Sequence, residues 1–89
     1  MKIALFKENQ KGKTYQTENF KILYRNKGTI SGDNSENVEE SLYLITGKAE
    51  ITLKEKTWIV EAPAELYFPT KTYHKIKAIT NISLIMFEK

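Results

Sequence analysis

The sequence predicts an all-β fold, either a sandwich or a small closed barrel of antiparallel strands. Most of its runs alternate apolar and polar residues with a period of two, as half-buried strands do. These runs are rich in β-branched and aromatic residues, which favour strands over helices. Turn residues interrupt them at intervals of about 8 to 12 residues, so we expect about seven or eight short strands.

Size and composition limit the organisation of the protein. The 89 residues are enough for one hydrophobic core, so we assign residues 1–89 to a single domain. The absence of cysteine excludes disulfides, thiolate metal sites and cysteine nucleophiles. The apolar run at the N-terminus is shorter than a secretory signal needs, and no run approaches the roughly 20 residues that span a bilayer. We therefore expect a cytoplasmic protein without a membrane partner.

The net charge of +3 raises the question of nucleic-acid binding. Lysines carry almost all of this charge, and they are interspersed with Asp and Glu instead of forming a basic block. Proteins that recognise bases and phosphates favour arginine for its bidentate geometry, and Arg25 is the single arginine. We expect a lysine-rich solvated surface and no nucleic-acid partner.

The first part of the chain contains one clear strand. Residues 1–6 can form a short strand, whereas residues 7–17 are weakly patterned and are expected to be a loop or an edge. Residues 19–25 alternate well, which indicates a half-buried strand. Its apolar face would carry Phe20, Ile22 and Tyr24, and its other face Lys21 and Arg25.

Residues 26–40 are polar and rich in Gly and Asn, so they are expected to form turns and loop. A helix is the alternative for the stretch that follows Asp33. Asp33 could cap its N-terminus, Val38, Leu42 and Ile45 have helical spacing, and Gly47 could end it. The strand-forming residues at 43–46 favour a strand instead, and both interpretations stay open on the local pattern.

From Gly47 onward the pattern is that of strands alone. The expected strands are residues 49–54, 57–61, 65–68, 73–78 and 82–87. In the fourth of these, His74 shares a face with Ile76 and Ala78. The last is almost entirely apolar, which predicts burial on both of its faces.

The spacing of the punctuating residues resembles the two motifs of the cupin family, which are small jelly-roll β-barrels. Gly28 is followed after five residues by Asn34-Ser35-Glu36, after three more by Glu40, and after six more by Gly47. This is the register of the first motif, with its two histidines replaced. In the second motif, Pro69 and His74 match, whereas Pro63, Lys71 and Ala78 keep the spacing but not the residue type. The resemblance implies a cupin-type jelly-roll barrel and a strand at residues 41–46.

The resemblance also implies where a metal would lie. In cupins that bind metal, three imidazoles and one carboxylate surround a divalent ion such as Mn, Fe, Ni or Zn. The corresponding positions here are Asn34, Glu36, Glu40 and His74, with a single imidazole among them. We therefore expect no cofactor and no strong transition-metal site. The alternative is a weak divalent metal site at Glu36, Glu40 and His74, whose oxygen ligands would favour harder ions such as Mn or Mg.

His74 allows two interpretations, a buried core residue with one satisfied ring nitrogen or a member of a site. A jelly roll would point His74 and Glu40 into a common interior, within hydrogen-bonding reach. A carboxylate beside an imidazole favours the charged form of each, which would give an acid/base pair poised near neutral pH. Catalysis would also need groups that stabilise developing charge, and Lys71 and Tyr24 are the candidates.

The aromatic residues fall into two groups. Tyr24, Trp58 and Phe68 lie on predicted core faces, where packing is their first role and contact with a ligand a second. Tyr43 and Tyr67 lie on the opposite faces of their strands. There they could cover an outer sheet surface that pairs two subunits, so we expect a homodimer.

The function that these observations favour is a small binding module that holds a small polar molecule in the barrel mouth. The expected ligand-binding residues are Glu40, His74, Tyr24 and Glu36. One alternative is a small enzyme, an isomerase, epimerase or metal-dependent lyase, that uses Glu40 and His74 as an acid/base pair or as metal ligands. The other is a structural or interaction protein whose barrel is filled by side chains.

Overall fold

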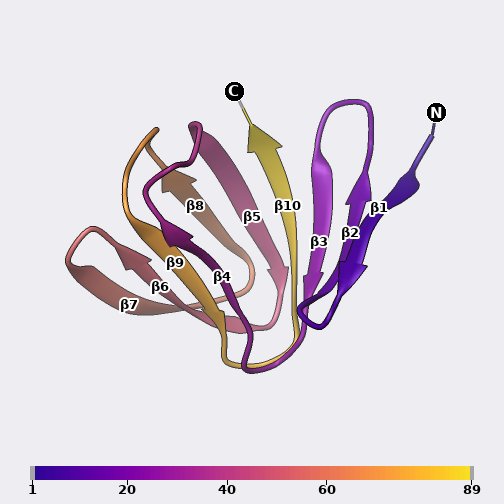
Figure 1. The fold of residues 1–89 in the computed structure, drawn as a ribbon. Coiled ribbons are helices and arrows are strands. Elements are labelled where there is room, and N and C mark those ends of the chain that lie inside the picture. Colours follow the sequence, from indigo (N-terminus) through magenta and orange to yellow (C-terminus); the bar gives the residue numbers. More distant parts are fainter. Residues whose placement is uncertain (1, 89) are drawn as a thin grey trace.

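The protein consists of two antiparallel sheets packed face to face (Figure 1). The computed structural model describes residues 2–88. Its strands are β1 (Ala4–Asn9), β2 (Gly12–Gln16), β3 (Lys21–Arg25), β4 (Ile30–Asn34), β5 (Glu40–Thr46), β6 (Lys48–Leu53), β7 (Lys56–Glu61), β8 (Ala64–Phe68), β9 (His74–Ala78) and β10 (Ile82–Glu88). The larger sheet has the order β1-β2-β3-β10-β5-β8 and the smaller one β4-β9-β6-β7. The predicted all-β sandwich is confirmed.

The hydrophobic core lies between the sheets, where alternate residues of facing strands meet. The six-stranded sheet contributes Leu23, Leu42, Leu44, Leu66, Phe68, Ile82 and Leu84, and the four-stranded sheet contributes Ala49, Ile51, Ile76 and Ala78. The chain passes from one sheet to the other at Gly47, whose φ is +93°. A side chain there would also collide with the backbone carbonyl of Asn81, so this crossing requires glycine.

The helix considered after Asp33 does not form. Residues 30–34 are strand β4, and residues 40–46 are strand β5, in which buried Leu42 and Leu44 alternate with exposed Tyr43 and Ile45. A strand is favoured here because Leu42 and Leu44 both pack into the core. In a helix, two residues that are two positions apart point in nearly opposite directions, so only one of them could be buried. Strand β4 lies in a region that was expected to be turns and loop, and strand β2 in one that was expected to be a loop or an edge. Both contain few large apolar residues and are held by ladders to β9 and β3.

Strand β3 has the opposite orientation from that predicted. Leu23 faces the core, and Tyr24 is 49 % exposed on the outer face. The expectation that Tyr24 packs in the core is therefore wrong, and so is the same expectation for Trp58, which lies 40 % exposed on the edge strand β7. Phe68 is buried as expected. Pairing with β10 decides the orientation, because Leu23 lies opposite the buried Leu84.

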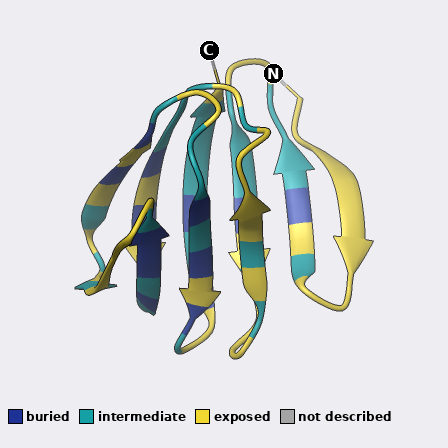
Figure 2. Cartoon of the chain, turned by 60° about the vertical axis from the view of Figure 1, so that its left-hand side comes forward, coloured by how far each residue is buried: buried dark blue, intermediate teal, exposed yellow. Residues whose placement is uncertain are grey.

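The two ends of the larger sheet differ in burial (Figure 2). Strand β1 is exposed along its whole length, because the smaller sheet does not extend over it. Strand β10, at the centre, buries Ile82 and Leu84, while Ile85 and Phe87 on its outer face are only half-buried. Burial of both faces of this last strand was predicted and is not observed. No helix able to cross a bilayer occurs between residues 2 and 88.

Candidate functional site

A pocket of about 350 Å³ opens between the two sheets, where β3 of the larger sheet separates from β4 of the smaller one. Its floor is apolar and consists of Leu23, Leu42, Ile76, Leu84 and Met86. Its polar groups are Arg25, Ser31, Asn34, Glu36, Asn37, Glu40 and His74. An apolar floor with a few converging polar groups is the usual construction of a small-molecule site.

Glu40 and His74 face each other across this pocket from different sheets. Glu40 is the first residue of β5 and His74 the first of β9, and Oε1 of Glu40 lies 3.6 Å from Nε2 of His74. Both side chains are largely buried, with exposed fractions of 13 % and 7 %. The ring of His74 also packs against that of Phe68, with centroids 4.7 Å apart. The predicted meeting of Glu40 and His74 in a common interior is confirmed.

The second ring nitrogen of His74 identifies where its proton lies. Nδ1 lies 3.1 Å from the backbone carbonyl of Thr72, which can only accept, so Nδ1 donates a hydrogen bond to it. The other ring nitrogen, Nε2, faces the Glu40 carboxyl at 3.6 Å, slightly farther than a direct hydrogen bond.

The environment of Glu40 raises the pKa of its carboxyl above the ordinary value. Burial raises the pKa of the Glu40 carboxyl, and the neighbouring Glu88 adds to this increase, whereas His74 and Lys21 lower the pKa by a smaller amount. We expected the imidazole to favour the charged carboxylate. That attraction is present but is outweighed by the loss of solvation, because Glu40 lies between the sheets beside Phe68, its partner on β8.

The remaining predicted metal ligands are not gathered around this pair. Glu36 and Asn34 line the same pocket, but both are exposed. The side-chain oxygen of Asn34 accepts the backbone N–H of Glu36 at 3.0 Å, and its nitrogen donates to the carbonyl of Gly32 at 3.0 Å. Asn34 is thus committed to a local turn. Across residues 2–88, no three His, Cys, Asp or Glu side chains form a group that could hold a metal ion, so these residues do not fit one.

Arg25 occupies the place in the pocket that we predicted for Tyr24. Tyr24 points to the outer face of β3, where its ring contacts that of Tyr15, and it does not line the pocket. Arg25 points inward because it pairs with the buried Ile82 of β10. The alternation along β3 identified the two faces of the strand but not which of them was inside. The one signal in the sequence that could have indicated the inner face is that the single arginine, Arg25, shares a face with Leu23.

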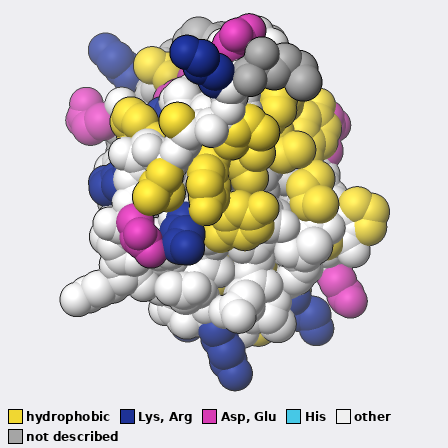
Figure 3. Space-filling model, turned by 90° about the vertical axis from the view of Figure 1, so that its right-hand side faces the viewer, with side chains coloured by type: hydrophobic (Ala, Val, Ile, Leu, Met, Phe, Trp, Pro, Cys, Tyr) yellow, Lys and Arg dark blue, Asp and Glu magenta, His cyan; other side chains and the backbone are white. Residues whose placement is uncertain are grey.

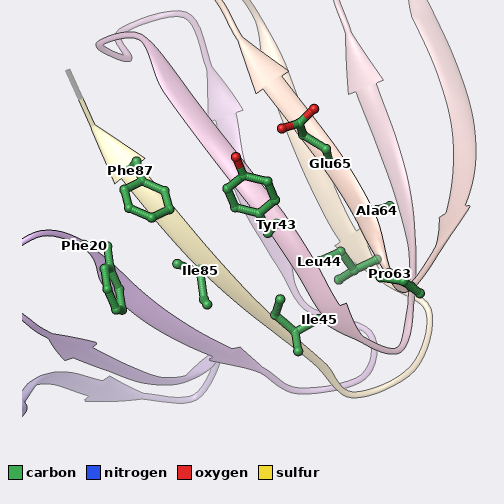
Figure 4. Close-up of a pocket in the computed structure, with 9 residues that line it drawn as sticks. All are labelled: Phe20, Tyr43, Leu44, Ile45, Pro63, Ala64, Glu65, Ile85 and Phe87. Carbon is green, nitrogen blue, oxygen red and sulfur yellow. The ribbon is translucent and has the colours of Figure 1, made fainter.

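A second, shallower hollow of about 450 Å³ lies on the outer face of the larger sheet (Figure 4). It is lined almost entirely by apolar and aromatic side chains, namely Phe20, Tyr43, Leu44, Ile45, Pro63, Ala64, Ile85 and Phe87, together with Glu65. The predicted outward orientation of Tyr43 and Tyr67 is confirmed, since they are 38 % and 49 % exposed. Hydrophobic side chains also gather into a patch on the side of the molecule where β1 lies (Figure 3).

The comparison of the sequence with known families and proteins finds no relative. No protein-family model matches the chain, and no curated protein matches it significantly. The comparison of structures, in contrast, finds many matches. The arrangement of the strands thus matches known proteins where the comparison of whole sequences does not.

Three solved structures illustrate the match. A conserved protein of unknown function from Streptococcus pyogenes has a TM-score of 0.72 and 22 % identity, over 91 % of this chain and 77 % of that one. A cupin superfamily protein from Desulfitobacterium hafniense has a TM-score of 0.69 and 15 % identity, over 82 % and 69 % of the two chains. The capsular polysaccharide assembling protein CapF from Staphylococcus aureus has a TM-score of 0.78 and 12 % identity.

The match to CapF covers 98 % of this chain but only 28 % of CapF, so this chain corresponds to one part of that larger protein. Identities this low show a shared fold and nothing about shared chemistry. Together with the two packed sheets and the inward-facing Glu40 and His74, these matches show that the chain has the cupin jelly-roll fold.

Proposed function

We propose that this protein is a small binding module that holds a small polar molecule in the pocket between its sheets, in contact with Glu40 and His74. The observation that carries the proposal is the pairing of two largely buried titratable side chains above an apolar floor. A pocket of about 350 Å³ lies at the lower end of the range that takes small organic ligands. Maintaining such a pair inside a core costs stability, which ligand recognition would explain.

A screen of small polar molecules by amide NMR on the ¹⁵N-labelled chain tests this proposal. We expect at least one compound to shift signals of residues around the pocket, and to lose affinity when Glu40→Gln replaces the carboxyl with an amide of similar size. Glu61→Gln is the control, because Glu61 is exposed at the end of β7 and lines no pocket described above. Binding that Glu40→Gln leaves unchanged would contradict the proposal.

A His74→Ala variant separates a site residue from a core residue. A variant that keeps its melting temperature and loses the ligand would assign His74 to the site. Because His74 is 5 % exposed and packs against Phe68, its removal also leaves a cavity, and loss of folding would assign it to the core. Glu40→Gln then remains the informative variant for binding.

Acid–base catalysis is a second candidate function, favoured by the close approach of the Glu40 carboxyl to the His74 imidazole inside the pocket. Such a pair could remove a proton from a bound molecule and return it, as an isomerase or epimerase does. A compound found in the screen would then take up deuterium from D₂O at the carbon next to its carbonyl group. Uptake that persists in Glu40→Gln would contradict this role.

We also propose that two copies of the chain associate through the outer face of the larger sheet. Its apolar side chains form a row across five neighbouring strands, Leu5, Tyr15, Ile22, Ile85 and Tyr43, each paired with the next in the ladder. The outer face of an antiparallel sheet in a monomer is usually polar. A second copy presents the same uncharged row, so two positively charged molecules can meet there with little repulsion, as a symmetric dimer requires.

A further inference from the structure

The pocket holds a cation that the Glu40–His74 pair does not explain. Arg25 is half-buried, and burial lowers the pKa of its guanidinium, although arginine stays charged at any ordinary pH. Among residues 2–88, no carboxylate lies within ion-pair distance of Arg25, whereas Lys13 pairs with Glu8 and Lys21 with Glu88. A half-buried charge without a counter-charge is unfavourable unless something supplies one.

The hydrogen bonds of Arg25 orient its guanidinium and leave part of it unused. Nη1 donates to the backbone carbonyls of Lys13 and Tyr24, at 3.1 and 3.0 Å, and Nη2 donates to Oγ1 of Thr14 at 2.9 Å. These bonds use three of the five N–H groups of an arginine. The Nε–H and one N–H of Nη2 have no partner among the described residues. These two N–H groups remain available to a ligand, and a carboxylate is an anion that a guanidinium readily binds.

The surroundings of Arg25 reinforce its positive charge. Arg25, Ser31 and Gly32 line the main pocket and also a smaller hollow of about 180 Å³, whose other walls include Lys7 and Lys11. No acidic residue lines this smaller hollow. The opposite end of the pocket is acidic instead, because it holds Glu36 and Glu40. Along β10, Arg25 lies beside Ile82 and Glu40 beside Glu88, which places them at opposite ends of that strand.

We propose that the ligand of this pocket is a small organic carboxylate, held at Arg25 through its acid group and at Glu40 and His74 through a polar group at the other end. This inference rests on the proposed function and specifies its ligand class. The apolar floor of Leu23, Ile76 and Leu84 would contact the hydrocarbon part between the two polar ends. The reverse orientation is disfavoured, since it would place a carboxylate against Glu40.

Two pairs of probes test this assignment on the full chain: 4-hydroxybenzoate with 4-hydroxybenzamide, and 6-hydroxyhexanoate with 6-hydroxyhexanamide. The members of each pair match in size and differ in charge. We expect each acid to shift the signals of pocket residues and to bind at least about tenfold more tightly than its amide, as for a charge-assisted hydrogen bond. Inorganic phosphate is included as a competitor, and it should displace the acids weakly because it cannot use the apolar floor.

Variants then assign the preference to Arg25. Arg25→Gln should remove the preference for the acids and leave the affinity for the amides unchanged, while Arg25→Lys should restore only part of it because lysine lacks the two-pronged geometry. Lys27→Gln is the control, since it removes the same charge at an exposed position outside the pocket. If Arg25→Gln fails to fold, the comparison of each acid with its amide on the unaltered chain still tests whether the pocket prefers a carboxylate.

The outcomes separate this inference from the proposed function. Acids favoured through Arg25 support both. Acids and amides that bind equally well at the pocket, or a preference that survives Arg25→Gln, would overturn the carboxylate assignment and leave the binding module intact. If the pocket signals respond to none of the four probes and the screen also finds no ligand, both the carboxylate assignment and the binding module would be overturned.

Discussion

The backbone of Gly32 passes against the imidazole of His74. A β-carbon at residue 32 would lie 2.9 Å from Cδ2 and 3.0 Å from Nε2 of that ring, and Gly32 has a φ of +83°. Gly32 lies on β4 and directly precedes the bulged Asp33, so the smaller sheet holds His74 from the side while Glu40 faces it from the larger sheet. The position of Nε2 thus depends on the absence of one methyl group.

Gly32→Ala should therefore disturb His74 beyond the cost of its backbone conformation. Gly28→Ala is a matched control, because Gly28 has a φ of +86° and nothing within 4 Å of its added β-carbon. We expect Gly28→Ala to lower the free energy of unfolding by about 1–2 kcal/mol and Gly32→Ala to lower it further. Urea denaturation measures the difference, and the NMR shifts of the His74 ring should move only in Gly32→Ala. Equal losses in both variants would show that the contact is unimportant.

The raised pKa of Glu40 makes stability depend on pH in a defined direction. Because the pKa of Glu40 is higher in the folded chain than its ordinary value of 4.5, the folded state binds the proton more tightly than the unfolded state does. Its contribution to stability is complete at pH values below 4.5 and is lost as the pH rises through the folded-state value. The titratable groups that face it are His74, Glu88 and Lys21.

Glu40→Gln removes this titration while retaining the shape of the side chain. We therefore expect the stability of Glu40→Gln relative to the natural chain to increase as the pH rises above 4.5, measured by urea denaturation at several pH values. Glu61→Gln should give a difference that does not vary with pH in this way. A relative stability of Glu40→Gln that falls with rising pH would mean that the ion pair with His74 dominates over burial.

The apolar outer face of the larger sheet predicts self-association. Ile45→Lys places a charge in the outer hollow, where Ile45 is 48 % exposed, and should convert a dimer into a monomer in sedimentation or light-scattering measurements. Ile59→Lys makes the same change on β7 of the smaller sheet, at a residue 60 % exposed, and should leave the dimer intact. A natural chain that is monomeric at millimolar concentration would refute the proposed interface.

The chemistry of the pocket predicts weak binding of divalent metals. Titration with Mn, Fe, Ni or Zn at micromolar concentration should leave the melting temperature unchanged, because Asn34 is committed to a turn and Glu36 is exposed. The double change Asn34→His and Glu36→His should create binding, since both positions line the pocket beside His74. A tight complex of the natural chain, detected by elemental analysis, would contradict this expectation.

The local pattern of residues predicted most of the strands, and the resemblance to the cupin motifs implied that Glu40 meets His74. Leu42 and Leu44 in β5, and Ile76 and Ala78 in β9, lie on the buried face of each strand. Burying that face places every second residue inside, and Glu40 and His74 are in phase with it. The spacing of the two cupin-like motifs then indicated that Glu40 and His74, which are far apart in the sequence, lie close together.

Tertiary structure alone decided which face of β3 is inside. Both faces of β3 carry amphipathic side chains, and the hydrocarbon stem of an arginine can line a pocket while its charge finds polar partners. The pairing of Leu23 with Leu84 turned Arg25 inward and Tyr24 outward. Asn34, a predicted metal ligand, likewise uses its side chain in hydrogen bonds with Gly32 and Glu36 instead. Alternation along a strand separates its two faces, but the strands that pair with it determine which face is buried.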